Sequence, residues 1–206
     1  MRIFFIGCVK TSEIFLKKLL DLELNVVGVI TKQTSSFNAD FVDLGKVCIE
    51  NNIDFLYAKN INDPVSEEYI LEKKPDIIFC FGWSQLLSER ILKIPPKGVI
   101  GFHPADLPKN RGRHPLIWAL VLGLEETCST FFEMNEKADE GRIISKSKVC
   151  INYEDDAQSL YNKILIEGCK QIEKFVEQFK KDNICYEIQK TKEGNVWRRR
   201  SKEDGK

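Results

Sequence analysis

One stretch of this 206-residue chain, GVIGFHPADLPKNRGRHP at 98–115, concentrates side chains suited to proton transfer and to binding an anion. It holds both histidines, His103 and His114, together with three basic residues. Histidine changes its charge near neutral pH, and arginine offers paired donors to phosphate or carboxylate groups. A carboxylate that could pair with His103 follows at Asp139, in the turn KADEG. The pattern favours acid–base chemistry, while a structural histidine and a turn-forming aspartate stay open as the alternative.

The usual cofactor and metal motifs are missing from the sequence. The first strand-to-helix turn, FFIGCVKTSEI, lacks the G-x-G-x-x-G spacing of a dinucleotide site, and no G-x-x-x-x-G-K-[ST] occurs. There is no serine nucleophile elbow and no H-E-x-x-H zinc motif. The seven cysteines lack C-x-x-C spacing, which is typical of reduced thiols in a cytosol. We therefore expect neither a dinucleotide cofactor nor a metal.

The composition indicates a globular protein without net charge. Lysine and arginine together number 31, as do aspartate and glutamate. No general field therefore draws the protein to nucleic acid or to a membrane surface. The apolar runs are much shorter than the ~20 residues of a membrane-spanning helix, and the N-terminal residues lack the regions of a signal peptide. We expect a cytoplasmic protein that binds anions through local charge.

Short apolar runs alternate with amphipathic stretches over the first half of the chain. The runs are continuous in valine, isoleucine and phenylalanine, as in strands covered on both faces. The expected strands are 2–7, 25–31, 54–58, 75–82 and 98–102, and the expected helices are 12–22, 41–51, 64–73 and 85–92. This order predicts an α/β fold with a doubly wound, mostly parallel sheet.

The second half of the chain has a different order of elements. After a helix at 115–122, two strand-like runs, 129–134 and 141–151, are joined by a connection too short for a helical crossover. They are therefore predicted to form an antiparallel pair. Asp155, with Gln158 three residues later, predicts the capping box of a long C-terminal helix.

Three segments are expected to meet at one edge of this sheet. Open α/β sheets bind ligands at the carboxyl ends of their strands, near the point where the strand order reverses. The turn FGWSQ at 81–85, His103 and the turn KADEG at 137–141 all adjoin ends of predicted strands. Their meeting point is the predicted active site.

These segments resemble the formyltetrahydrofolate-dependent formyltransferases, whose members act on methionyl-tRNA, glycinamide ribonucleotide and amino sugars. The family pattern is Asn-x-His, Leu-Pro, Arg-Gly, a threonine-bearing strand and Ala-Asp-x-Gly. The matching residues here, in order, are His103, Leu107-Pro108, Arg111-Gly112, Thr130 and Ala138-Asp139-Glu140-Gly141. The resemblance covers residues 1–200, and the runs RGRHPLIWALVLG and WRRRSKEDG look most like the enzymes that formylate nucleotide-linked amino sugars.

The resemblance implies transfer of a formyl group from 10-formyltetrahydrofolate to a nucleotide-linked amino sugar, as in lipopolysaccharide biosynthesis. His103 would stabilise the developing oxyanion or relay a proton, and Asp139 would orient it and accept the proton of the amine. Gly101 stands where the family has its catalytic asparagine, which donates a hydrogen bond to the oxyanion. We expect another donor to replace that asparagine, with Gly101 leaving space beside His103 for the acceptor.

The same resemblance implies the binding residues. Those expected to bind folate are Phe81, Gly82, Trp83, Ser84, Leu87 and Asp139, with Trp83 as a mere cover for the sheet edge kept as the alternative. Those expected to bind the acceptor, and its diphosphate above all, are Pro104, Lys109, Arg111, Gly112 and Arg113. The expected partners are these two small molecules, with neither nucleic acid nor membrane, and a homodimer stays open.

Other activities stay open at this stage. They are a formyltransferase of the glycinamide ribonucleotide or methionyl-tRNA type, a formyltetrahydrofolate hydrolase, and a non-catalytic binder that has lost the family asparagine. Residues 1–190 are expected to form the catalytic domain, followed by a charged extension at 191–206. That extension is polar except for Val196 and Trp197, and we expect it to be truncated or naturally short.

Overall fold

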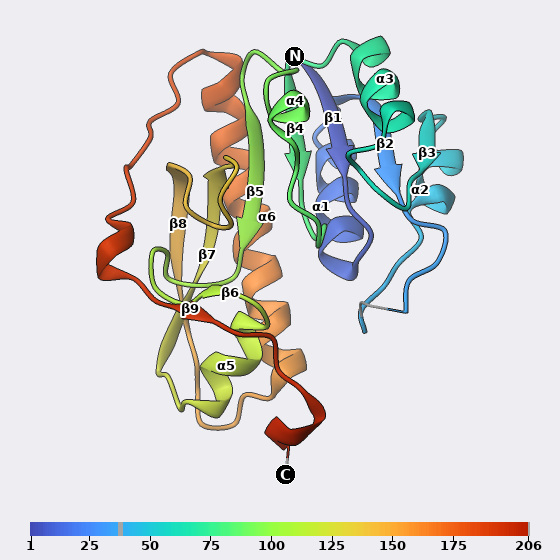
Figure 1. Cartoon of the computed structure of the whole chain (residues 1–206). Helices are drawn as coiled ribbons and strands as arrows, with labels where there is room; N and C mark the ends of the chain where they lie inside the picture. The colour runs from blue at the N-terminus through green and yellow to red at the C-terminus, as the bar shows by residue number, and fades with distance from the viewer. Residues whose placement is uncertain (37–38, 206) are drawn as a thin grey trace.

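A seven-stranded sheet forms the body of the protein (Figure 1). The computed structural model describes residues 1–36 and 39–205. The strands are β1 (Arg2–Ile6), β2 (Asn25–Thr31), β3 (Phe55–Tyr57), β4 (Ile77–Cys80), β5 (Val99–His103), β7 (Glu126–Glu133) and β8 (Ile143–Cys150), and their order is β3-β2-β1-β4-β5-β7-β8. The first five are parallel, β7 runs antiparallel to β5, and β8 runs antiparallel to β7. The predicted doubly wound sheet with a late antiparallel pair is confirmed.

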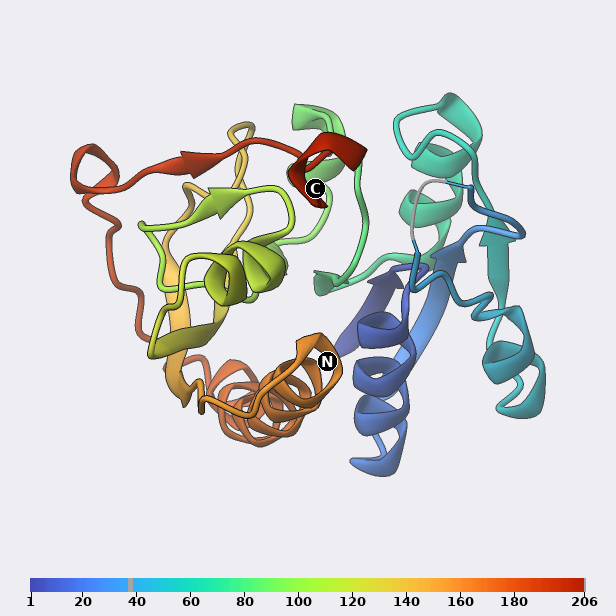
Figure 2. The same ribbon diagram turned by 90° about the horizontal axis from the view of Figure 1, so that it is seen from below.

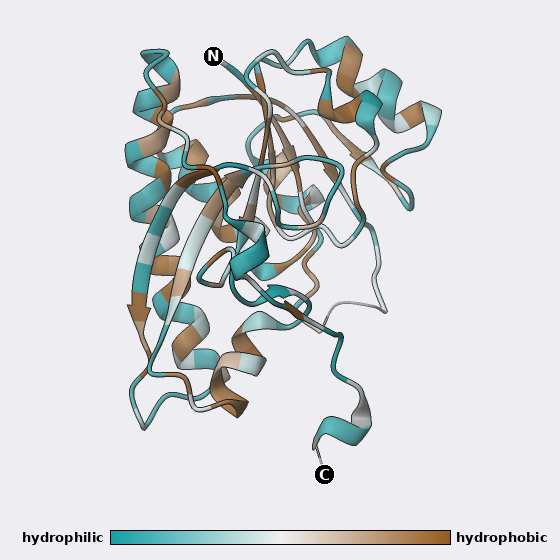
Figure 3. Ribbon diagram, turned by 60° about the vertical axis from the view of Figure 1, so that its left-hand side comes forward, coloured by the Kyte–Doolittle hydropathy of each residue, from teal (hydrophilic) through white to brown (hydrophobic). Residues whose placement is uncertain are grey.

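Helices cover both faces of this sheet (Figure 2). They are α1 (Lys10–Asp21), α2 (Gly45–Glu50), α3 (Pro64–Lys73), α4 (Glu89–Leu92), α5 (Pro115–Val121) and α6 (Ala157–Lys180). On one face Phe15 of α1 and Phe175 of α6 share a core with Phe79 and Phe131 of the strands. On the other face Ile70 of α3 packs in a second core with Ile91 of α4. The parallel strands between these two layers are coloured mainly hydrophobic in Figure 3.

The reversal of strand order lies between β1 and β4. From β1 the chain proceeds outward to β2 and β3, and it then returns to β4 and β5 on the opposite side. Crossovers that diverge from two neighbouring strands leave a crevice at the carboxyl ends of those strands. The segments that follow β4 and β5 carry the predicted site residues, so the sheet places them at this crevice.

Several predicted helix boundaries differ from the structure: the helix expected at 12–22 is Lys10–Asp21, and the one expected at 41–51 is only Gly45–Glu50. The helix expected at 85–92 is confined to α4, because the preceding residues are tied to the loop after β3. Gln85 accepts a hydrogen bond from the Ile61 amide at 3.0 Å, and Asn62 donates one to the Leu86 carbonyl at 2.9 Å. Helix α6 begins one residue later than expected, with Asp156 as N-cap and Ser159 as its capping-box partner.

The end of the chain packs on the loop that follows β5. Strand β9 (Val196–Trp197) pairs in parallel with β6 (Arg111–Gly112) in a separate two-stranded sheet (Figure 1). The ring of Trp197 stacks on that of Trp118 in α5, with the ring centroids 5.0 Å apart. Short 3-10 helices, η1 (Thr191–Glu193) and η2 (Lys202–Gly205), flank this contact. The charged extension is therefore attached to the loop that carries the candidate acceptor residues.

Candidate active site

A cavity of about 420 Å³ lies at the carboxyl ends of β4 and β5. The turn after β4, the end of β5 and the KADEG turn all line it, as expected. Its lining residues are Val9, Cys80, Gly82, Trp83, Ser84, Leu86, Gly101, Phe102, His103, Gly112, Arg113, Phe132, Met134, Lys137, Ala138 and Asp139. Burial raises the pKa of the Cys80 thiol, so it stays protonated at neutral pH and is a poor nucleophile. His103 and Asp139 are the candidate acid–base pair of this cavity.

His103 is buried at the end of β5, with its side chain 7% exposed. Its Nε2 lies 2.9 Å from the carbonyl oxygen of Asn110. Because a carbonyl can only accept, this contact assigns the proton to Nε2. The other nitrogen, Nδ1, lies 3.7 Å from Oδ1 of Asp139, which is too far for a hydrogen bond but close enough for an electrostatic interaction. Nδ1 is therefore the nitrogen available to exchange a proton with a ligand.

Asp139 is held by its own turn. Its backbone is left-handed, with φ 58°, and its Oδ2 accepts a hydrogen bond from the Gly112 amide at 3.0 Å. The Gln189 side chain donates to the carbonyls of Asp139 and Gly141 at 3.0 and 2.6 Å. A Cβ on Gly141 would collide with the carbonyl oxygen of Glu133, so only glycine fits there. Asp139 is thus both a turn former and a wall of the cavity.

Asn110 is a site residue that the sequence analysis missed. It also has a left-handed backbone, with φ 59°, and this conformation accompanies a carbonyl aimed at His103. Its side-chain oxygen accepts hydrogen bonds from Trp197 at 2.8 Å and from Asn195 at 3.2 Å. The C-terminal tail therefore contributes to the orientation of the His103 imidazole. The tolerance of asparagine for left-handed backbone was the one local signal available.

Thr130, in the strand beside His103, secures the start of the same loop. It is paired with His103 in the β5–β7 register, and its hydroxyl donates to the Ala105 carbonyl at 2.7 Å. Both Thr130 and this hydrogen bond are buried. The threonine therefore positions the segment after His103 rather than lining the cavity.

The direction in which a side chain at position 101 would project is occupied by Met134 and Phe132. A Cβ built on Gly101 would lie 2.8 Å from Cγ of Met134 and 3.0 Å from Cζ of Phe132. Gly101 nevertheless lines the cavity of His103, so the expectation that it leaves space there for the acceptor stays a prediction. Met134 lies where a side chain at position 101 would begin, which accounts for the glycine in steric terms.

We expect Gly101→Asn to destabilise the protein unless Met134 is shortened as well. Overpacking of this kind costs about 1–3 kcal/mol, measurable by urea unfolding. In Met134→Ala the same substitution should cost much less, giving a non-additive double-mutant cycle. The matched control is Gly123→Asn, because Gly123 has φ 64° and nothing within 4 Å of an added Cβ. Additive costs at positions 101 and 134 would contradict this packing.

The residues expected to bind folate fall into two groups. Gly82, Trp83 and Ser84 line the cavity, as does Asp139. Phe81 and Leu87 are 0% and 4% exposed and belong to the two hydrophobic cores, so they support the turn from beneath. Leu86, which was not expected, lines the cavity instead of Leu87.

The basic residues of the loop also have different environments. Arg111 is buried, forms an ion pair with Glu140 and donates to the Thr191 carbonyl at 3.3 Å. The Lys109 side chain is 64% exposed and lies 4.0 Å from Asp106. Neither lines the described cavity, whereas Arg113 does and donates to the Ser84 carbonyl at 3.1 Å. The ion pair with Glu140 neutralises the charge of Arg111 and argues against its expected contact with a diphosphate, whereas the expected contact of Lys109 stays a prediction.

A second cavity, of about 750 Å³, adjoins the first and shares Gly82 and Phe102 with it. It lies between α5, the start of α6 and the start of α1. Its remaining lining residues are Thr11, Ala39, Asp40, Pro104, His114, Pro115, Leu116, Ile117, Asp156, Ala157, Gln158 and Tyr161. Pro104, an expected acceptor residue, thus lies in this mainly apolar cavity, next to His103 in the chain.

Residues 1–36 and 39–205 contain no group of three or more histidine, cysteine or acidic side chains that could hold a metal ion. In the same part of the chain no helix is both long enough and apolar enough to span a bilayer.

Comparison with known proteins identifies the family. The formyl transferase family model matches residues 1–175. A curated relative, the bifunctional polymyxin resistance protein ArnA of Wigglesworthia glossinidia brevipalpis, is 36% identical over 168 residues. That match covers 81% of this chain and 26% of the relative, so the chain spans about a quarter of the relative's length.

Solved structures share the fold. One is the N-formyltransferase of Helicobacter canadensis, in complex with folinic acid and dTDP-3-aminofucose, with a TM-score of 0.76, 20% identity, and coverage of 94% of this chain and 70% of that one. Another is glycinamide ribonucleotide transformylase 1 of Symbiobacterium toebii, with a TM-score of 0.76 and 18% identity. That match covers 92% of this chain and 94% of the transformylase. With the family model matching most of its length and the His103–Asp139 pair at the strand ends, this chain belongs to the formyl transferase family.

Proposed function

We propose that this protein transfers a formyl group from 10-formyltetrahydrofolate to the amine of a nucleotide-linked amino sugar. The observation that carries the proposal is the position of His103 and Asp139 in a cavity that adjoins a second one. Transfer between two substrates requires a donor site and an acceptor site on either side of the acid–base group. Acting on a nucleotide-linked sugar is supported by the Helicobacter canadensis structure, which was solved with dTDP-3-aminofucose.

The first cavity fits the pterin and the formyl group of the donor. Leu86 and Met134 supply apolar walls, and the turn at Gly82–Ser84 supplies backbone groups for an amide-like ring. The buried Nε1 of Trp83 has no hydrogen-bond partner among the described residues, so a ligand acceptor would satisfy it. The bound donor supplies a formyl carbon open to attack by an amine. Gly82, Trp83, Ser84 and Asp139 would hold it there.

His103 would exchange the proton. An amine must lose a proton to attack, and negative charge develops on the formyl oxygen as it does so. Because Nε2 is bonded to Asn110, Nδ1 accepts the proton or, once protonated, stabilises that oxygen. The carboxylate of Asp139, 3.7 Å from Nδ1, would interact electrostatically with the imidazole. As the bond between the formyl carbon and N10 of the donor breaks, the protonated Nδ1 would give its proton to that nitrogen, and tetrahydrofolate would leave.

The proposal also includes a location in the reducing cytoplasm and two small molecules as the ligands of the protein. Four of the seven cysteines are buried, which suits a protein of the cytoplasm. Folate and the amino sugar are the proposed ligands, and self-association can be measured by light scattering.

The test is a screen of nucleotide-linked amino sugars with 10-formyltetrahydrofolate and the full chain. We expect one acceptor to gain the mass of a formyl group, as read by mass spectrometry, with release of tetrahydrofolate. Release of formate without any amine would instead support a hydrolase. Folate binding without turnover on any acceptor would support a non-catalytic binder, and formylation of glycinamide ribonucleotide would assign the purine activity.

A further inference from the structure

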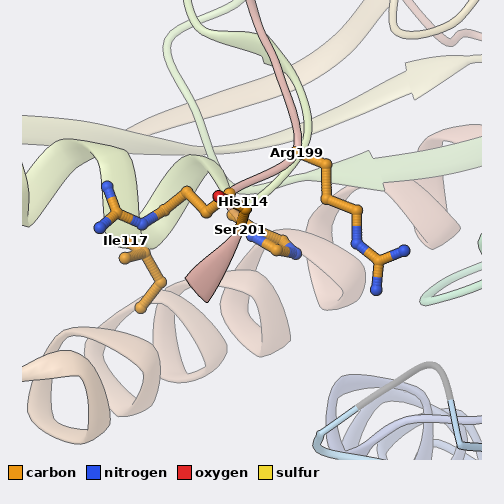
Figure 4. A pocket seen from close by; sticks show the side chains of 5 residues that line it. His114, Ile117, Arg199 and Ser201 are labelled. Atoms are coloured by element: carbon orange, nitrogen blue, oxygen red, sulfur yellow. The ribbon is translucent and has the colours of Figure 1, made fainter. Parts of the chain in front are cut away.

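A cluster of positive charge lies where the C-terminal tail crosses the start of α5. His114, Arg199 and Arg200 line a cavity of about 680 Å³ there, with Ile117 and Ser201. Figure 4 shows Arg199 and Ser201 of the tail beside His114 and Ile117 of α5. These residues are far apart in the sequence, so only the docking of the tail assembles the cluster.

Three guanidinium groups act on the same imidazole. The pKa of His114 is lowered from its ordinary value, first by burial and then by repulsion from Arg199, Arg113 and Arg200. Arg113 reaches this cluster from the loop after His103 and also lines the catalytic cavity. Like charges held this close create a local positive field, although the whole chain has no net charge.

Ring contacts and hydrogen bonds hold the tail in place. Trp197 stacks on Trp118, and Trp118 Nε1 donates to the Arg198 carbonyl at 3.0 Å. The guanidinium of Arg200 lies 4.8 Å from the centre of the Trp118 ring. The carboxylate of Asp204, also on the tail, is bonded to Arg198 and to the Ser201 amide. The cluster is thus pre-organised, which lowers the cost of binding a ligand.

The cluster is also connected to the catalytic pair. His114 and Ile117 line both its cavity and the apolar cavity, which in turn shares Gly82 and Phe102 with the cavity of His103. The three cavities therefore form a series. A ligand with an amine at one end, a sugar between and negative charge at the other end would match this series in order.

We propose that Arg199 and Arg200, with His114 and Arg113, bind the diphosphate of the acceptor. Guanidinium groups form paired, charge-assisted hydrogen bonds with phosphate oxygens, and such bonds are the strongest of their kind. The identity of the acceptor rests on the proposed function, whereas the anion site rests on the cluster itself. The C-terminal tail then contributes to both ends of the acceptor, through Asn110 at His103 and through its arginines at the diphosphate.

The test uses inorganic pyrophosphate as the probe, titrated into the full chain by calorimetry at low salt. We expect Arg199→Gln/Arg200→Gln to weaken its binding about tenfold or more, with a smaller dependence on salt. The matched control is Arg90→Gln, which removes the same charge from a side chain that is 81% exposed on α4. Arg199→Gln alone spares the contacts of Arg200, so it keeps the test valid if the double variant does not fold.

A second readout follows His114 by NMR, which is practicable because the chain has two histidines. Pyrophosphate bound beside His114 should raise the pKa of His114, since a nearby anion favours the charged imidazole.

Wild-type affinity for pyrophosphate in the Arg199 and Arg200 variants, or no binding of pyrophosphate to the wild type, would overturn the site. Pyrophosphate binding through these arginines without formylation of any amino sugar would refute the proposed function alone. Formylation with an unchanged acceptor KM in the variants would refute the anion site alone.

Discussion

Replacing His103 with alanine is expected to lower kcat for formyl transfer by about 10²–10⁴-fold, the range typical of a lost general acid–base group. Nδ1 of His103 is the nitrogen left to exchange a proton, because Nε2 is engaged by the Asn110 carbonyl. Steady-state kinetics with the acceptor from the screen would measure the change. The KM for the folate donor should change little, because Trp83 and its turn are untouched.

The controls for this variant separate chemistry from folding. His103→Gln places an amide nitrogen at about the reach of Nε2, so it can donate to the Asn110 carbonyl and should preserve the loop but not the activity. Circular dichroism and tetrahydrofolate binding should match the wild type in both variants. Turnover within a few-fold of wild type in His103→Ala would remove His103 from the mechanism.

Replacing Glu140 with alanine is expected to lower the free energy of unfolding by about 3 kcal/mol, because breaking a buried ion pair leaves an uncompensated charge. The charge left behind is that of Arg111, whose side chain is 9% exposed and whose Nε already lacks a partner among the described residues. Urea unfolding would measure the loss. Activity should also fall, since Glu140 follows Asp139 in the turn that faces His103.

The control for this second variant is Lys137→Ala. Lys137 lies 3.8 Å from the other oxygen of Glu140, but its side chain is 76% exposed, so the pair is screened by water. Its loss should cost less than about 1 kcal/mol. Replacing both Arg111 and Glu140 with apolar residues of similar size should cost far less than Glu140→Ala. Equal losses from Lys137→Ala and Glu140→Ala would show that Arg111 is not buried as a charge.

The arrangement of the sheet could be predicted because its signals are local. Continuous apolar runs such as Ile77–Cys80 indicated strands covered on both faces, and the short link between β7 and β8 required an antiparallel pair. The helix expected at 85–92 failed for the opposite reason. Its first residues bond to Ile61 and Asn62, which no local pattern reveals.

Some residues of the candidate site could likewise be predicted from the sequence, and others could not. His103 and Asp139 could be singled out from residue types and from the family pattern, and both line the catalytic cavity. Phe81 and Leu87 were placed in the folate site because they adjoin it in sequence, yet their side chains point into the two cores. The position of a residue in the chain does not by itself show whether its side chain faces the cavity or a hydrophobic core.

By itself the sequence determined the strands, the family and the turn that carries Asp139, because each depends on neighbouring residues. Only the tertiary structure decided which charges remain available to a ligand. Arg111 and Glu140, 29 residues apart, neutralise each other, while Arg199 and Arg200 come to lie beside His114. It also decided the tautomer of His103, through an Asn110 loop bonded to Asn195, 85 residues away. Ion pairs and hydrogen bonds over such separations depend on the path of the whole chain, because their energy is set by distance in space.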